Sequence, residues 1–190
     1  VTWATTVFPI FNVGLKPKFV DVNLDDFCMN VDSAEKAVNN KTSMMLPVHL
    51  LGNVCDMKYV KEISSKEDLL VMEDCCEAHG AEFKNKKVGA IGDIGTFSFF
   101  LSHHITTIEG GMIVTKNKML YELAKSLRAF GWIRDLDSKN EVIKKYSNID
   151  PRFLFTRIGY NFRPTEIQGA FGIHQIKKLD KFIKKRENNT

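Results

Sequence analysis

The sequence predicts an α/β protein with a mainly parallel sheet and helices on both faces. Short β-rich runs alternate with segments of helical periodicity, which is typical of strand–helix–strand crossovers. The chain has 190 residues and is 44% hydrophobic, so it can bury a real core. Two helical segments also begin at a capping residue, Asp56 and Asn117. Together these features favour one α/β domain or a large part of one.

Five short runs have the composition of β-strands, being rich in apolar and β-branched residues. They cover residues 18–22, 44–48, 69–72, 95–100 and 112–115. Because helical patterns separate several of them, we expect most of these strands to pair in parallel.

The two capped helices each show one apolar face. Apolar residues recur at positions 57, 60 and 63 after Asp56, and at positions 120, 123, 127 and 130 after Asn117. Gly131 then fits the position just past the end of the second helix, where glycine is favoured.

The last part of the chain reads as a long helix. Thr165-Glu166-Ile167-Gln168 has the form of a capping box, and apolar residues follow at helical spacing. We therefore expect residues 1–163 to belong to one large domain, and residues 164–190 to form a long helix toward a small C-terminal domain outside this sequence. The chain opens at Val1 inside an amphipathic pattern, so we expect a fragment.

Composition excludes several classes of protein. A net charge of +4 is too small to indicate nucleic-acid binding, and no apolar run reaches the roughly 18 to 20 residues that cross a bilayer. No basic segment followed by an apolar stretch opens the chain, so we expect no signal peptide in this sequence. The four cysteines, at positions 28, 55, 75 and 76, form no CxxC pair, so we expect reduced thiols, no metal site and a cytoplasmic protein.

A polar segment, residues 73–80, follows the predicted strand 69–72. It therefore lies at the carboxyl end of a buried strand, where α/β sheets bind ligands. Taken alone, Asp74 and Glu77 are better explained as a capping box for a following helix. A third possibility is a zinc or iron site, although no known ligand spacing supports it; its donors would be Asp74, Glu77, His79, His103 and His104.

Seven blocks, in this order and at this spacing, resemble the DegT/StrS family of sugar-nucleotide aminotransferases, which are pyridoxal phosphate enzymes of fold type I. The resemblance runs from about Val1 to Phe182. The blocks are Trp3-Ala4-Thr5-Thr6, Pro47-Val48-His49 with Gly52, Glu73-Asp74 through Gly80-Ala81, Gly92-Asp93, Phe97-Ser98-Phe99, Glu109-Gly110-Gly111 and Gly159-Tyr160-Asn161-Phe162-Arg163.

The resemblance implies roles for four residues in a large cofactor-binding domain. Asp74 would pair with the pyridinium nitrogen and keep the ring protonated. Trp3 would stack on the ring, and Ser98 would donate to the cofactor's phosphate. Asn161 would reach the phosphate of a neighbouring subunit's cofactor, which implies a homodimer.

One position departs from the aminotransferase pattern. Family aminotransferases carry their Schiff-base lysine where this chain has His103, and histidine cannot form that imine. The same exchange, in Ser-x-x-x-x-His-His-Ile-Thr, marks the 4-keto-6-deoxy sugar nucleotide 3-dehydratases, which hold their cofactor non-covalently. Glu77 points the same way, since the dehydratases have glutamate near the cofactor's phenolic oxygen and many aminotransferases have glutamine.

The resemblance thus implies C3 dehydration of a nucleotide-linked 4-keto-6-deoxyhexose. The cofactor would be pyridoxal or pyridoxamine 5'-phosphate, with His103 as the base and an amino donor such as glutamate. Some related dehydratases bind an iron–sulfur cluster through cysteines after a Trp-x-Arg-Asp segment. Here Trp132-Ile133-Arg134-Asp135 is followed by no cysteine, which argues against the cluster.

Two alternatives remain open at this point. An atypical sugar-nucleotide aminotransferase would need another lysine, and Lys116 and Lys118 lie beyond the predicted strand 112–115. A non-catalytic or truncated family member would keep the fold but bind no cofactor. The sequence also leaves open whether His103 or His104 faces the cofactor.

Overall fold

Four strands form the central sheet, in the order β1-β2-β5-β6, in the computed structural model, which describes residues 1–189. β1 (Met44–Met45), β2 (Leu70–Asp74) and β5 (Ile94–Ser98) are parallel, whereas β6 (Gly111–Val114) runs antiparallel to β5. β3 (Glu82–Phe83) and β4 (Lys86–Lys87) form a separate hairpin. The predicted α/β class with a mainly parallel sheet is confirmed.

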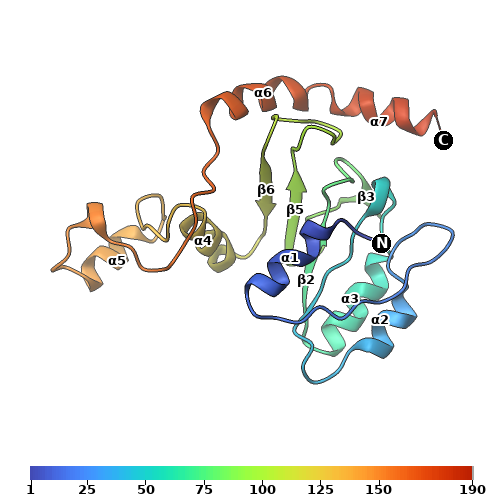
Figure 1. Cartoon of the computed structure of the whole chain (residues 1–190), viewed down its shortest axis with the longest axis horizontal. Helices are drawn as coiled ribbons and strands as arrows, with labels where there is room; N and C mark the ends of the chain where they lie inside the picture. Colours follow the sequence, from blue (N-terminus) through green and yellow to red (C-terminus); the bar gives the residue numbers. More distant parts are fainter. Residues whose placement is uncertain (190) are drawn as a thin grey trace.

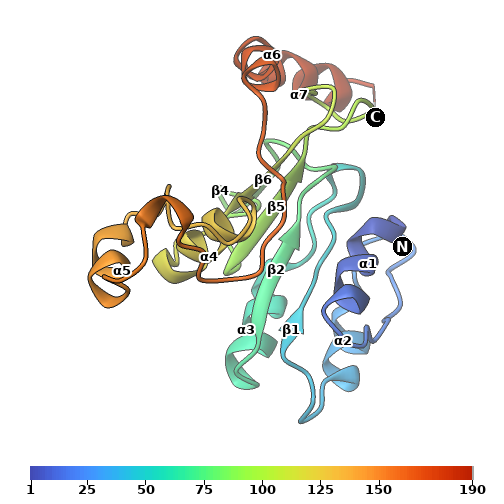
Figure 2. The same cartoon turned by 60° about the vertical axis from the view of Figure 1, so that its left-hand side comes forward.

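Helices lie on both sides of this sheet. Figure 2 shows β1 and β2 between α1 (Ala4–Asn12) on one side and α3 (Met57–Lys66) on the other. α2 (Val31–Ala37) packs beside α3. The main core lies beneath these two helices and consists of Cys28, Ala34, Met45, Cys55, Met57, Val60, Ile63, Leu69 and Val71.

The predicted caps form as expected. The Asp56 carboxylate accepts hydrogen bonds from the backbone N–H groups of Lys58 and Tyr59, at 3.1 and 3.4 Å, where α3 begins. The Asn117 side chain does the same at the start of α4 (Lys118–Leu127). Thr165 and Gln168 form the predicted capping box of α6 (Glu166–Ile176). These contacts satisfy backbone donors that have no partner inside a helix.

Three predicted strands are wrong or shorter than expected. Residues 18–22 form no strand, because the backbone of this segment bonds to the turn that follows, through Asn30 N–H to Asp21 O at 3.0 Å. β1 stops at Met45 because Pro47 has no N–H to continue the ladder, and only Val48 makes a further bridge, with Asp74. Residues 99 and 100 leave β5 and enter the following loop.

The segment after α4 also differs from its prediction. α4 ends at Leu127 with Arg128 as its C-cap, so Gly131 is not the capping glycine and Phe130 lies outside the helix. Gly131 instead sits in a turn with φ +82°, where an added Cβ would overlap the backbone of Arg157. An arm with α5 (Lys139–Lys145) and the 3₁₀ turn Pro151–Phe153 then extends from the sheet (Figure 1).

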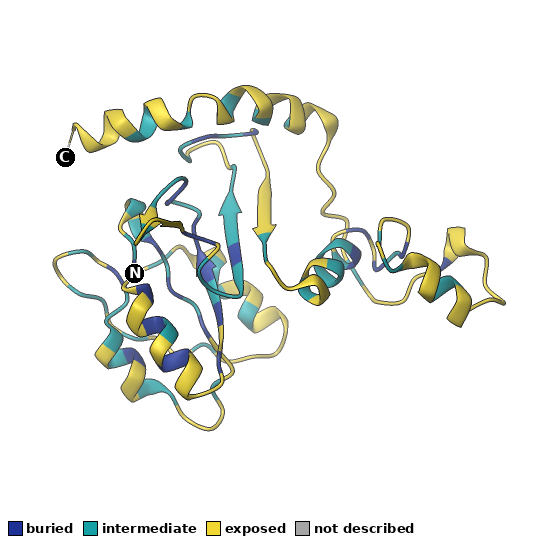
Figure 3. Cartoon of the chain, turned by 180° about the vertical axis from the view of Figure 1, so that it is seen from behind, coloured by how far each residue is buried: buried dark blue, intermediate teal, exposed yellow. Residues whose placement is uncertain are grey.

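The predicted single C-terminal helix is two helices, α6 and α7 (Leu179–Glu187), separated by a turn at Lys177-Lys178. They run past the carboxyl end of β5 (Figure 1). Figure 3 shows that most of their surface is exposed. Within residues 1–189, no helix is long and apolar enough to cross a membrane.

Candidate active site

The carboxyl ends of the three parallel strands meet at one edge of the sheet (Figure 1). Val48 and His49 follow β1, Asp74 ends β2 and Ser98 ends β5. The loop of residues 99–110 also begins and ends there, because β6 starts opposite Ser98 at Gly111. The predicted residues Asp74, Ser98 and His103 are therefore brought to the same edge, where such sheets bind ligands.

Asp74 is nearly buried, with 8% of the residue exposed, and each of its carboxylate oxygens accepts a hydrogen bond. Its Oδ2 accepts a hydrogen bond of 2.7 Å from the Thr6 hydroxyl, and its Oδ1 accepts one of 3.1 Å from the Cys76 N–H. Its backbone is bonded to β1 through Pro47 O. The carboxylate is thus a fixed acceptor at the edge of the sheet.

The predicted capping box at Asp74 and Glu77 is wrong. No helix follows Asp74, and residues 75–80 form successive turns instead. The Glu77 Oε2 accepts a hydrogen bond of 2.9 Å from the backbone N–H of Leu51. Leu51 itself has a left-handed backbone, with φ +55°. Glu77 therefore ties the turn after β1 to the turn after β2, and its second oxygen stays available.

Trp3 lies near Asp74 through the start of α1. It is the N-cap of that helix, and the Thr6 N–H bonds to its carbonyl at 3.1 Å. The Thr6 hydroxyl in turn bonds to Asp74, and Trp3 as a residue is 77% exposed. An exposed indole beside a fixed carboxylate is available to stack on a planar ligand.

The histidine loop follows Ser98. The Ser98 hydroxyl oxygen accepts from the Phe100 N–H at 3.2 Å, and the His103 N–H bonds to Phe100 O at 3.1 Å. At the far end of the loop, Phe99 N–H bonds to Gly110 O. Both ends of the loop are therefore closed by hydrogen bonds.

His79 is a buried neighbour of this loop that the sequence indicated only as a possible metal ligand. Its ring centroid lies 5.5 Å from that of His104 and 6.3 Å from that of His103. Burial, followed by the nearby His104 and His103, lowers the pKa of His79 to about 4. Burial, with Arg186 and His103, likewise lowers the pKa of His104 to about 4. Both rings are therefore neutral at pH 7.

Glu73 and His49 form a buried cluster that sequence reasoning missed. The Glu73 carboxylate accepts from His49 Nε2 at 3.1 Å and from the N–H groups of Gly89, Ile91 and Gly92 at 2.6 to 2.9 Å. Burial opposes the charge, but these donors hold the pKa of Glu73 below its ordinary value. The strand period could have revealed it, because Glu73 shares a face with buried Val71.

The same cluster brings together three possible metal ligands, His49, Glu73 and Cys75, whose donor atoms lie within 4.8 Å of one another. His49 Nε2 faces Glu73 and its Nδ1 accepts from the Cys55 N–H, while both Glu73 oxygens already accept hydrogen bonds. These contacts explain the cluster as a structural one. In residues 1–189 the alternative set of Asp74, Glu77, His79, His103 and His104 does not gather its donor atoms in this way.

Asn161 lies apart from these residues. It pairs with Ala129, just after α4, and its side-chain oxygen accepts from Arg163 Nε at 3.5 Å. Within residues 1–189, none of its hydrogen bonds connects it to Asp74, Ser98 or the histidine loop. Its predicted role at a neighbouring subunit's cofactor stays a prediction.

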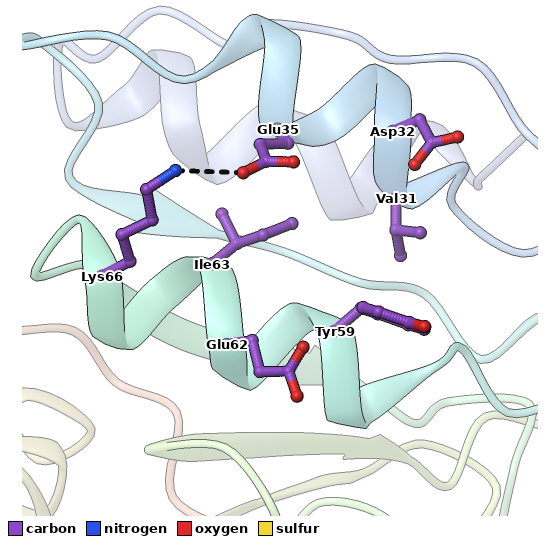
Figure 4. Close-up of a pocket in the computed structure, with 7 residues that line it drawn as sticks. All are labelled: Val31, Asp32, Glu35, Tyr59, Glu62, Ile63 and Lys66. Carbon is purple, nitrogen blue, oxygen red and sulfur yellow. Dashed lines mark hydrogen bonds and ion pairs between the residues drawn. The ribbon is translucent and has the colours of Figure 1, made fainter.

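α6 contacts the histidine loop, and α7 packs on the turn after β2. The Gln168 amide donates to Glu109 O at 2.7 Å, and Gly80 packs against Leu179 and Ile183 of α7. A groove of about 370 Å³ remains beside the loop, lined by His104, Phe182, Lys185, Arg186 and Asn189. A second groove, of about 250 Å³, lies between α2 and α3 and contains none of the predicted site residues (Figure 4).

Comparisons with known proteins agree with this arrangement. A family model for the DegT/DnrJ/EryC1/StrS aminotransferase family matches residues 1–190. GDP-4-keto-6-deoxy-D-mannose 3-dehydratase of Escherichia coli O55:H7 is 42% identical over 191 residues, which are 100% of this chain and 49% of that protein. The chain thus spans about half the length of the curated relatives it matches.

Solved structures of GDP-4-keto-6-deoxymannose-3-dehydratase have the same fold. A histidine-to-asparagine variant with bound GDP-perosamine superposes with a TM-score of 0.92 at 42% identity, over 100% of this chain and 50% of that one. A double variant, with lysine for the same histidine and asparagine for the preceding serine, gives 0.92 at 41%, over 100% and 50%. A form with a trapped PLP-glutamate geminal diamine gives 0.87 at 40%, over 95% and 47%.

The match over the whole chain and the likeness to these structures lead to the same assignment. This chain belongs to the DegT/DnrJ/EryC1/StrS aminotransferase family.

Proposed function

We propose that this protein is a pyridoxal phosphate-dependent enzyme that removes the C3 hydroxyl of a nucleotide-linked 4-keto-6-deoxyhexose. The observation that carries the proposal is the position of His103. It lies on the loop between β5 and β6, at the edge where Asp74 and Ser98 end their strands, and it stands where the family's aminotransferases have lysine. The chain would then hold its cofactor without a covalent bond.

The residues at this edge fit such a cofactor. Asp74 offers a fixed, nearly buried carboxylate to a protonated ring nitrogen, and Trp3 offers an exposed indole to the ring's face. Ser98 offers a hydroxyl to a phosphate. When bound, pyridoxamine phosphate supplies an amine that condenses with the sugar's ketone and a ring that accepts electrons.

The reaction then assigns a task to each side chain. With the cofactor bound, His103 would take a proton from its C4′ carbon and could deliver one to the departing C3 oxygen, because an imidazole can act as both base and acid. A placed base of this kind contributes on the order of 10² to 10⁴ in rate. Glu77 has one oxygen bonded to Leu51 and a second that can face the cofactor's phenolic oxygen.

The solved relatives support the choice of His103. In the structures described above, a histidine that directly follows a serine was replaced by asparagine or lysine. This chain contains one Ser-His pair, Ser102-His103. The pair lies in the loop that the resemblance selects, and the His104 ring lies closer to buried His79 than the His103 ring does, at 5.5 against 6.3 Å.

We also propose a substrate class, an amino donor, a homodimer and a compartment. A GDP-sugar and glutamate are supported by the ligands of the relatives.

A homodimer is supported by α6, whose exposed apolar residues lie all around the helix. Helices with apolar residues on every side are normally buried. The exposed residues are Ile167, Phe171, Ile173 and Ile176. Sedimentation of the protein tests it, since a monomer at all concentrations contradicts it. The cysteine pattern favours the reducing cytoplasm.

Product analysis tests the proposed reaction. With a GDP-linked 4-keto-6-deoxyhexose, pyridoxal phosphate and glutamate, we expect a 3-deoxy sugar and release of ammonia. His103→Asn should remove this activity, whereas His174→Gln, on the exposed side of α6, should not.

Borohydride treatment separates the proposal from its aminotransferase alternative. The unmodified protein should release its cofactor after reduction, and His103→Lys should retain it covalently. Formation of a stable amino sugar, or covalent cofactor in the unmodified protein, would show that the chain is an aminotransferase instead.

A further inference from the structure

Two threonine hydroxyls connect the start of the chain to Asp74. The Thr2 Oγ1 lies 2.9 Å from the Thr6 Oγ1, and the Thr6 Oγ1 lies 2.7 Å from the Asp74 Oδ2. Both threonines are partly buried. Asp74 thus has a side-chain donor that comes from another element, 68 residues earlier in the sequence.

The chemistry of the groups fixes the direction of these hydrogen bonds. An ionised carboxylate can only accept, so the Thr6 hydroxyl must donate its single proton to Asp74. The oxygen of Thr6 is then free only to accept, and Thr2 must be its donor. Each hydroxyl therefore has one possible orientation while Asp74 is charged. The pair therefore presents a fixed donor to one oxygen of Asp74.

Thr6 also connects Asp74 to Trp3, through its side chain and its backbone respectively. The Thr6 N–H bonds to Trp3 O at 3.1 Å, within the first turn of α1. The Thr6 side chain crosses from that turn to β2. Within residues 1–189, this hydrogen bond is the side-chain link from the first turn of α1 to β2. One side chain therefore sets where the exposed indole stands relative to the carboxylate.

We propose that Thr6 is a positioning residue of the cofactor site, and that Thr2 fixes the orientation of its hydroxyl. The inference rests on the proposed function, because it takes Asp74 as the partner of the cofactor's ring nitrogen. Thr6 holds one oxygen of Asp74, while the Cys76 N–H holds the other. The carboxylate then needs no reorientation when a protonated ring nitrogen binds, and the indole of Trp3 is already placed.

Binding of pyridoxal phosphate to variants tests this role. Thr6→Val keeps the shape of the side chain but removes its donor, and we expect the dissociation constant to rise roughly ten- to a hundredfold, since hydrogen bonds to charged groups contribute about 1.5–3 kcal/mol. Thr6→Ser should bind like the unmodified protein. Thr2→Val should show a smaller loss, and the pH at which the bound cofactor's absorption changes should move only in Thr6→Val and Thr2→Val.

Thr5→Val is the matched control. Thr5 lies in the same turn of α1 and is exposed, and its side chain makes no hydrogen bond within residues 1–189, so its replacement tests the cost of valine there. If Thr6→Val binds the cofactor with the same affinity and spectrum as Thr5→Val, the positioning role is refuted.

A double-mutant cycle distinguishes failure of this inference from failure of the proposed function. Urea unfolding of Thr6→Val, Asp74→Asn and the double variant, without cofactor, should show that the two changes are not additive. If the unmodified protein binds no pyridoxal phosphate but the cycle shows coupling, the proposed function fails and the hydrogen bond stands. Additive effects in the cycle would refute the Thr6–Asp74 link itself.

Discussion

Glu73 and Asp74 are adjacent carboxylates on β2 that face opposite sides of the sheet, since successive strand residues alternate. Glu73 points into the core, is fully buried and accepts four hydrogen bonds. Asp74 accepts two from other residues and is slightly exposed. The fully paired carboxylate is therefore structural, and its neighbour retains acceptor capacity for a ligand.

Glu73→Gln should strongly destabilise the protein. The amide carries no charge and replaces one acceptor oxygen with a donor, so N–H groups from the segment 89–92 lose their partner. Leaving buried N–H groups without an acceptor costs about 1–3 kcal/mol, which urea unfolding would detect. Glu82→Gln, in the exposed pair with Lys87, is the control and should cost less than about 1 kcal/mol. Equal losses in both variants would contradict the structural role.

Among the elements, those that depend on local signals were predictable. The caps at Asp56, Asn117 and Thr165 form as the sequence indicated, because a cap needs only a side chain and its own helix. Residues 18–22 form no strand because their backbone bonds to the turn that follows, whereas the box at Asp74 failed because its outcome depends on a distant partner. Asp74 bonds to Thr6 rather than to a following helix, and no local pattern contains that contact. The division into domains at residue 163 stays a prediction.

The docking of α7 on the segment after β2 gives a prediction for Gly80. Gly80 has φ +84°, and an added Cβ would overlap the Cδ1 of Ile183. Gly80→Ala should therefore lower the melting temperature, both by backbone strain and by displacing α7. Gly80→Ala combined with Ile183→Ala should recover part of the loss.

Gly14→Ala isolates the backbone term in this experiment. Gly14 has a similar φ of +76° but nothing within 4 Å of its added Cβ. If Gly80→Ala and Gly14→Ala shift the melting temperature equally, α7 does not pack on Gly80 as the structure indicates.

At the scale of the whole molecule, the core and the candidate active site are separate. The main core lies under α2 and α3, whereas Asp74, Ser98 and the histidine loop lie at the carboxyl edge of the sheet. Buried His79 and partly buried His104 connect the site to global stability, because both have lowered pKa values in the folded protein. The free energy of unfolding should therefore depend on pH where these two histidines titrate.

The free energy of unfolding should fall as the pH drops from about 6.5 toward about 4. The pKa values of His79 and His104 are lowered to about 4 when folded, first by burial, so the unfolded chain binds more protons within this window. The stabilisation is therefore complete above pH 6.5 and is lost on acidification. Urea unfolding at several pH values measures the slope, which His79→Phe should reduce. His174→Gln, an exposed histidine on α6, should leave the slope unchanged, and equal slopes in the two variants would contradict the assignment.

Because β6 returns antiparallel to β5, both ends of the histidine loop are anchored in paired strands. Ser98 faces Gly111 across the ladder, so the twelve residues between them start and finish on adjacent, paired strands. The register of the sheet is set by β5 and β6 and does not depend on what residue 103 is. A lysine and a histidine can therefore be exchanged at position 103 without a change in the sheet. Such an exchange would alter the reaction, while Asp74 and Ser98 would keep their places at the edge of the sheet.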